Sequence, residues 1–258
     1  MSDGRIDLSI SGTVATLTIN NPKKLNAVSV SMWRQLDDAL AQVGEEVRCI
    51  VVQGYDKAFA SGADISEFGD QRGSAEANAA YDSAAGSAMT RLYSMPQPTV
   101  AKISGYCFGG GMGIALCCDI RLASETSQFC IPAARLGLGY GWTGIKKLLD
   151  VVSVPVATEI LVTARRYPAA EALTMGLVNR LYASDALDAA VAEYAQTISQ
   201  NAPLTIRAAK QTIKELSRLG STDFALCERL VSDCFNSDDY REGAKAFLEK
   251  RSPQFAGH

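Results

Sequence analysis

The sequence contains almost no histidine, since the only one among its 258 residues is the last, His258. Catalytic units of the Ser-His-Asp and Cys-His kinds need an imidazole held inside a formed site. A side chain at a chain end is expected to fray instead. Zinc sites mostly use histidine or closely paired cysteines, and none of the seven cysteines forms a C-x-x-C pair. The sequence therefore predicts a function that uses neither histidine nor zinc.

Long apolar runs, basic clusters and a leader segment are also missing. The longest stretch without charge, residues 103–118, is rich in glycine and falls short of the ~18–20 apolar residues of a membrane span. A net charge of -3 without a basic run argues against a nucleic-acid partner. Charges within the first seven residues leave no apolar core for a secretory signal. The cysteines, mostly in apolar runs, predict reduced core thiols. We expect a cytoplasmic protein without membrane or nucleic-acid partners.

What the sequence does contain is an α/β half followed by a helical half. Residues 6–10 and 14–19 alternate apolar and polar side chains around Ser11-Gly12, which predicts a hairpin. Apolar spacing and short apolar runs predict helices at 31–43 and 75–95, and strands at 49–52, 99–103, 119–123 and 128–131. Beyond residue 143 one strand is predicted at 177–181, and the rest is helix, at 144–152, 156–163, 169–175, 185–199, 204–219, 223–235 and 238–250. Because these helices must bury their apolar stripes, we expect them to pack on the first half or on another subunit.

Two loops of small residues follow predicted strands. The loop that begins at Gly109 opens a helix, but it fits neither phosphate-binding pattern: Gly111 stands where a Walker loop needs lysine, and Ile114 where a dinucleotide loop needs glycine. Glycines at a helix start can bare N–H groups for a phosphate, a carboxylate or a developing oxyanion, or can serve close packing alone. The loop 59–65 also exposes backbone after a strand. Two such loops could direct two N–H donors at one oxygen.

Several motifs, in order along the chain, resemble the crotonase (enoyl-CoA hydratase/isomerase) superfamily from about residue 6 to 255. They are NNPKKLNA at 20–27, FASGADI at 59–65, PTVAKISGYCFGGG at 98–111, CDIRLA at 118–123, AEALTMGLVN at 170–179 and the segment 242–255. The resemblance implies an α/β fold in which residues 1–195 form a spiral of ββα units with an acyl-CoA site. Residues 196–258 would form a helical trimerisation region, giving a homo-trimer or a hexamer made as a dimer of trimers. Coenzyme A would be part of the substrate, with no further cofactor and no metal.

The resemblance also assigns roles to residues of the two loops. The N–H groups of Ala63 and Gly110 would hold the thioester oxygen, and removing one such donor typically costs ~2.7–4 kcal/mol of transition-state stabilisation. The backbone around Ser61, Ala63 and Ile65 resembles the family's adenine-contacting loop. Asp64 lies in the same coenzyme A-binding segment, where a structural role is favoured. Lys24, like Lys23, could meet the phosphates of coenzyme A or be a solvated surface lysine.

The pattern breaks at the two positions where the family's hydratases carry their catalytic glutamates. Gly113 and Ala133 stand there instead. Because a positioned acid or base contributes about 10²–10⁴-fold to a rate, we expect little or no hydration of crotonyl-CoA. The two small residues are expected to enlarge the acyl pocket, which they would line.

Tyr140 and Trp142 follow a Leu-Gly turn that, in the family, borders the acyl pocket. Tyr140 resembles a tyrosine of methylmalonyl-CoA decarboxylase, although that enzyme has a histidine where this chain has Ala63; pocket lining alone is the alternative. Glu67, Asp70 and Arg135 are weaker candidates for acid–base work or for pairing with a substrate carboxylate. Three hypotheses stay open: a hydratase/isomerase-type enzyme with atypical proton handling, a decarboxylase or hydrolase, and a non-catalytic acyl-CoA-binding protein.

Overall fold

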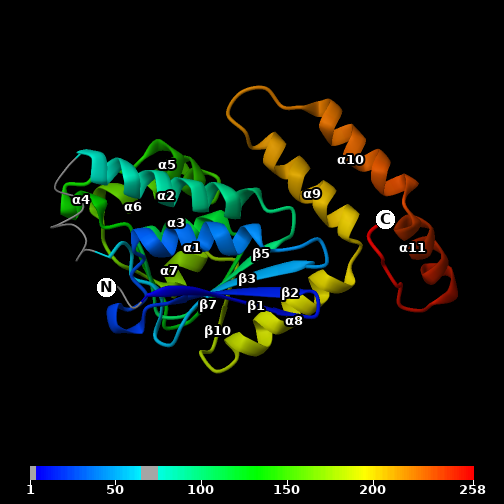
Figure 1. The fold of residues 1–258 in the computed structure, drawn as a ribbon, viewed down its shortest axis with the longest axis horizontal. Coiled ribbons are helices and arrows are strands. Elements are labelled where there is room, and N and C mark those ends of the chain that lie inside the picture. The colour runs from blue at the N-terminus through cyan, green and yellow to red at the C-terminus, as the bar shows by residue number, and fades with distance from the viewer. Residues whose placement is uncertain (1–3, 65–74) are drawn as a thin grey trace.

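Two β-sheets and the helices around them make up the computed structural model, which describes residues 4–64 and 75–258 (Figure 1). The first sheet has the strand order β1-β2-β3-β5-β7-β10, and the second has the order β4-β6-β8-β9. The strands of the first sheet are β1 (Arg5–Ser11), β2 (Val14–Asn20), β3 (Cys49–Gly54), β5 (Thr99–Ile103), β7 (Ile120–Ser124) and β10 (Arg180–Tyr182). Those of the second are β4 (Ala58–Ala60), β6 (Tyr106–Phe108), β8 (Gln128–Cys130) and β9 (Tyr167–Pro168).

The chain winds between the sheets in a repeating pattern. Three successive segments each give one strand to the first sheet, one to the second, and then a helix. They are β3-β4-α2, β5-β6-α3 and β7-β8-α4, with α2 at Ala75–Ser94, α3 at Gly110–Cys117 and α4 at Ala133–Leu136. The strands of successive segments pair in parallel, whereas β1 and β2 form the predicted antiparallel hairpin. This is the ββα arrangement that the sequence motifs imply.

The main core lies between the sheets and the helices that cover them. Helix α1 (Val30–Ala41) begins after Ser29, whose Oγ accepts the N–H of Met32 at 3.3 Å; such caps satisfy a free donor of the first turn. Side chains of a strand alternate between faces, so Ile50 of β3 enters the main core and Val51 faces the opposite side. There α8 (Leu187–Gln200) covers the first sheet with a smaller apolar cluster.

The second half of the chain is mostly helical, as predicted, but it also contains the strand β9, which the sequence did not predict, besides β10. Its helices are α5 (Trp142–Leu149), α6 (Val154–Thr163), α7 (Ala169–Thr174), α8, α9 (Pro203–Leu216), α10 (Phe224–Asn236) and α11 (Asp238–Glu249). In Figure 1, α10 and α11 stand apart from the sheets, with α10 against α9. The domain boundary predicted after residue 195 falls inside α8, which packs on the first sheet. Helix α9 is the first helix that extends away from the sheets (Figure 1). Among the described residues, no helix is long and apolar enough to span a bilayer.

Two expectations about the second half need correction. The strand predicted at 177–181 lies at Arg180–Tyr182, because Leu177 and Val178 instead close the end of α7 with hydrogen bonds to the carbonyl of Ala172. The chain end does not fray, since a backbone oxygen of His258 accepts the N–H of Asp238 at 2.9 Å. This bond satisfies a free donor at the start of α11. It also holds the C-terminal segment, which carries the only histidine, at the start of this helix.

Candidate functional site

The segment 20–27 holds the first loop of the site. A short 3₁₀ turn at Pro22–Lys24 leads into Leu25 and Asn26, which both have positive φ angles. The buried Asn26 side chain donates from Nδ2 to the carbonyls of Tyr55 (2.7 Å) and Ala58 (2.6 Å). Its Oδ1 accepts the N–H of Asn21 at 2.9 Å. Asparagine tolerates this left-handed backbone better than most residues, so one side chain fixes the strained turn and joins it to β4.

The same segment aligns the loop 61–64 through backbone hydrogen bonds. The carbonyl of Gly62 accepts the N–H of Val28 at 2.8 Å, and the N–H of Asp64 donates to the carbonyl of Val28 at 3.1 Å. In this strand-like contact the residue between them, Ala63, directs its N–H to the other side. Among the described residues, no protein group accepts that N–H. The loop therefore presents one backbone donor.

The charged residues beside this loop bind each other. Lys24 Nζ lies 2.7 Å from Oδ2 of Asp64, whose side chain is 2% exposed. Ser61 donates its hydroxyl to the carbonyl of Lys24 at 2.9 Å. These contacts support the structural role expected for Asp64. A role for Lys24, Ser61 or Asp64 in binding coenzyme A stays a prediction, and Ile65 lies outside the described residues.

The second loop brings the start of α3 against the first. The N–H of Gly109 donates to the carbonyl of Cys130 at 2.8 Å, and α3 begins at the next residue. The first bond of the helix runs from Gly113 N–H to the Gly109 carbonyl, so the N–H of Gly110 has no acceptor inside the helix. A Cβ at Gly111 would lie 2.5 Å from the carbonyl oxygen of Ala60. Only glycine allows α3 to approach β4 this closely.

The two predicted donors meet. A Cβ built on Gly110 would stand 3.8 Å from the backbone nitrogen of Ala63. The loops also touch at Gly62, whose φ is +113°, because a Cβ there would lie 3.4 Å from the carbonyl oxygen of Phe108. Two backbone N–H groups without an acceptor among the described residues thus lie close together at the positive end of a helix. The arrangement is suited to an oxygen that gains negative charge.

Two aromatic residues that the sequence did not single out for function line the same point. From the position of a Gly110 Cβ, Cζ2 of Trp33 is 3.2 Å away and the hydroxyl of Tyr81 is 3.7 Å away. Their rings are perpendicular, with centroids 6.4 Å apart. Helical spacing correctly predicts that Trp33 is buried in α1, but it carries no sign of what the indole faces. Nothing in the sequence around Tyr81 indicates a functional role, because this residue lies in an alanine-rich helix without a motif.

The places expected for the two glutamates are buried and close to the glycine loop. Gly113 is buried one turn into α3, and Ala133 is buried at the first position of α4. A Cβ on Gly113 would lie 3.0 Å from the sulfur of Met89. The sulfur of Met89 therefore occupies space beside Gly113, and an acyl pocket enlarged by the two small residues stays a prediction.

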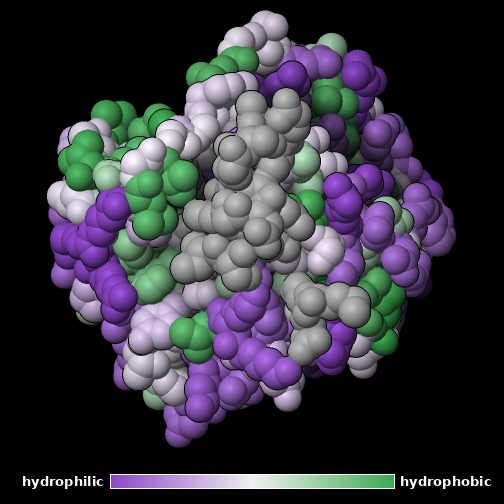
Figure 2. Space-filling model, turned by 60° about the vertical axis from the view of Figure 1, so that its left-hand side comes forward, coloured by the Kyte–Doolittle hydropathy of each residue, from purple (hydrophilic) through white to green (hydrophobic). Residues whose placement is uncertain are grey.

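Tyr140 and Trp142 have different surroundings. The partly buried ring of Tyr140 packs on α5, where a Cβ at Gly144 would be 2.8 Å from its Cε1. Burial raises the pKa of Tyr140 to about 12, so its hydroxyl stays protonated at neutral pH. Trp142 is 73% exposed at the start of α5. Figure 2 brings the α4 end of the molecule forward and shows separate hydrophobic patches on this face. Glu67 and Asp70 lie outside the described residues, and Arg135 is exposed.

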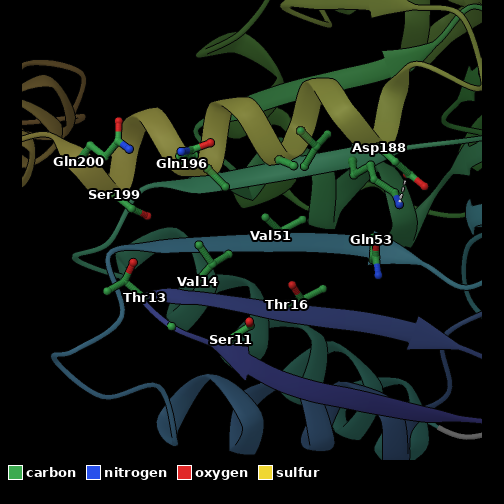
Figure 3. Close-up of a pocket in the computed structure, with 15 residues that line it drawn as sticks. Ser11, Thr13, Val14, Thr16, Val51, Gln53, Asp188, Gln196, Ser199 and Gln200 are labelled. Carbon is green, nitrogen blue, oxygen red and sulfur yellow. Dashed lines mark hydrogen bonds and ion pairs between the residues drawn. The ribbon is translucent and has the colours of Figure 1, made fainter.

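A separate groove lies on another face of the molecule. A cavity of about 630 Å³ runs between α8 and the strands β1 to β3, with Thr16, Gln53 and Gln196 among its polar lining (Figure 3). The ion pair of Lys102 with Asp188, at 2.5 Å, closes one end. This groove is on the α8 face of the first sheet, whereas Trp33 and the glycine loop pack against the other face.

Cysteines and possible metal ligands add no reactive group. All seven cysteines are free thiols, five of them buried, and burial raises the pKa of Cys117 to about 11. A thiol with so high a pKa is a poor nucleophile near neutral pH. In the described ranges, no group of three or more His, Cys, Asp or Glu side chains could hold a metal ion.

Known proteins match this chain over nearly its whole length. The Short-chain-enoyl-CoA hydratase of Clostridium acetobutylicum is 31% identical over 255 residues, 97% of each chain. The Methylmalonyl-CoA decarboxylase of Escherichia coli is 30% identical over 251 residues, 95% of each chain. The crystal structure of an enoyl-CoA hydratase/carnithine racemase from Magnetospirillum magneticum superimposes with a TM-score of 0.91 at 36% identity, covering 98% of this chain and 96% of that one.

These likenesses confirm the crotonase-like α/β fold with C-terminal helices that the motifs implied. The match is continuous and is not confined to the two loops, because the model of the Enoyl-CoA hydratase/isomerase family fits residues 9–258. The chain belongs to the enoyl-CoA hydratase/isomerase family.

Proposed function

We propose that this protein binds an acyl-CoA thioester and stabilises negative charge on the thioester oxygen with the N–H groups of Ala63 and Gly110. The observation that carries this proposal is the convergence of the two loops, where a Gly110 Cβ would stand 3.8 Å from the Ala63 nitrogen. Charge that develops on this oxygen as an enolate forms meets donors that are already oriented. Such preorganised donors contribute more to catalysis than equivalent groups in water.

The proton transfers of the reaction would not use the family's paired glutamates. Gly113 and Ala133 bring no carboxylate, and the sulfur of Met89 lies beside Gly113. The hydroxyl of Tyr81 lies beside the proposed donor pair, 3.7 Å from the Gly110 Cβ position, and is a polar group near the site. We infer an enzyme with atypical proton handling, for which hydration of crotonyl-CoA is slow or absent.

Decarboxylation is the second candidate, supported by the similarity to the decarboxylase of Escherichia coli. Loss of CO₂ from a malonyl-type thioester leaves the bonding electron pair on the α-carbon, and the two amides would stabilise the resulting enolate. The step needs no base, and one proton then completes the product. The protonated hydroxyl of Tyr140 would orient the departing carboxylate.

The C-terminal helices support a proposed homo-trimer or hexamer. Helices α9 to α11 extend from the body (Figure 1) and expose large apolar side chains, with Phe247 84% and Leu248 81% exposed. Exposed apolar surface of this kind marks association sites. Light scattering after size exclusion would measure the mass. A monomer at micromolar concentration would refute the assembly without touching the site.

A panel of acyl-CoA thioesters assayed with two variants tests the site. Proline is tolerated at the first helical position, so Gly110→Pro removes the N–H and keeps α3. Gly110→Ala keeps the N–H and places the same Cβ against Trp33, which makes it the steric control. We expect the proline variant to lose about 10²–10³-fold in kcat and the alanine variant much less. Equal losses would contradict the proposed role of the amide. Tight binding of thioesters without any product would favour the non-catalytic hypothesis.

A further inference from the structure

The indole N–H of Trp33 is a buried donor without a partner. Its side chain is 1% exposed, and Nε1 contacts no hydrogen-bond acceptor in the part of the chain that the structure describes. Buried polar groups are nearly always hydrogen-bonded in native proteins, because an unsatisfied donor costs free energy. A buried donor without a protein acceptor can be satisfied by an acceptor atom of a bound ligand.

The indole lies close to the donor pair. Cζ2 of Trp33 is 3.2 Å from the position of a Gly110 Cβ, and the nitrogen of Ala63 is 3.8 Å from the same point. Cζ2 is bonded to the ring carbon that carries Nε1, so the N–H edge of the ring borders this space. The perpendicular ring of Tyr81 packs against the indole and fixes its plane.

We propose that Trp33 Nε1–H donates a hydrogen bond to an oxygen of the bound acyl group, as a third donor beside the amides of Ala63 and Gly110. The inference rests on the proposed function, because it needs an acyl thioester in this site. Two oxygens have the required chemistry: the thioester oxygen itself, and a hydroxyl, keto or carboxylate oxygen on the acyl chain. The second would make Trp33 a selector for oxygenated acyl groups.

Nuclear magnetic resonance of the full-length protein reports on this bond directly. The chain has two tryptophans, so the Trp142→Phe variant assigns the Trp33 indole N–H signal without altering Trp33. The protein is titrated with free coenzyme A, with butyryl-CoA, whose acyl group has only the thioester oxygen, and with 3-hydroxybutyryl-CoA. A downfield shift with both thioesters and none with coenzyme A identifies the thioester oxygen. A shift with 3-hydroxybutyryl-CoA alone identifies the chain oxygen.

A second measurement compares affinities of wild type and Trp33→Phe for the same three ligands. Loss of the donor should lower the affinity for the thioester that shifts the signal by about tenfold. The affinity for free coenzyme A should stay within twofold. Both thioesters binding without a downfield shift, together with unchanged affinity in Trp33→Phe, would overturn the inference while the proposed function stands. Failure of every thioester to bind would overturn both. The wild-type spectra, in which the Trp142→Phe variant assigns the Trp33 signal, decide the matter even if Trp33→Phe does not fold.

Discussion

Replacement of Asn26 by alanine should destabilise the protein more than any single hydrogen bond can explain. The buried side chain makes three hydrogen bonds, to the carbonyls of Tyr55 and Ala58 and from the N–H of Asn21. It also stands at φ +59°, where alanine is less favourable than asparagine. The variant therefore removes the ties between the turn and β4 and strains the turn at the same time.

The magnitude follows from these contacts. Three net hydrogen bonds at about 0.5–1.5 kcal/mol each give about 1.5–4.5 kcal/mol. The left-handed backbone adds about 1 kcal/mol for alanine. We therefore expect the free energy of unfolding to fall by about 2.5–5.5 kcal/mol, a large part of the ~5–15 kcal/mol that folded proteins have.

Denaturant unfolding followed by circular dichroism measures this loss, with Asn20→Ala as the matched control. Asn20 is also buried, but it ends β2 without a positive φ and makes one described side-chain bond, to Asp7 at 2.7 Å. The control should lose about 1 kcal/mol. If Asn26→Ala lost no more than Asn20→Ala, the turn would not hold the first loop in the way described.

Three further outcomes follow from the structure. Gly113→Glu should displace the sulfur of Met89, which lies 3.0 Å from its Cβ position. Combined with Met89→Ala, which makes room for the new side chain, it should raise crotonyl-CoA hydration at least tenfold. An unchanged rate in the folded double variant would contradict the role given to the missing carboxylate. Gly111→Ala should lower acyl-CoA turnover and stability together, since its Cβ would stand 2.5 Å from a β4 carbonyl, and wild-type kinetics would refute that close contact. Burial lowers the pKa of Lys214, which lies beside the Tyr93 ring, from 10.5 to about 8. Between pH 8 and 10.5 the Lys214 side chain is therefore protonated in the unfolded chain and mostly neutral in the folded protein, so the free energy of unfolding rises with pH. Lys214→Met should accordingly gain most in melting temperature over wild type at pH 7 and less by pH 10, and a gain independent of pH would contradict the lowered pKa.

The sequence was informative where local pattern decides the structure. Helical spacing located α1 and the helices of the second half, and the alternating residues of the hairpin located β1 and β2. The three-residue strands β4 and β6 were missed, because their brief buried runs beside glycine have no periodicity. Their ends are the loops of the site, and the motifs located these loops by resemblance.

The surroundings of the loops could not be predicted, because they depend on contacts between distant elements. The thioether of Met89 comes from α2 and fills the space beside Gly113 in α3. The indole of Trp33 comes from α1 and reaches the first residue of α3. Neither contact leaves a mark in local sequence, since each residue also fits an ordinary core position of its own helix.

The most direct test of the central claim is a crystal structure with a non-hydrolysable acyl-CoA analogue bound. The account predicts that the oxygen that replaces the thioester carbonyl lies within about 3.1 Å of both the Ala63 and the Gly110 nitrogens. An analogue bound with this oxygen away from either amide would contradict the account.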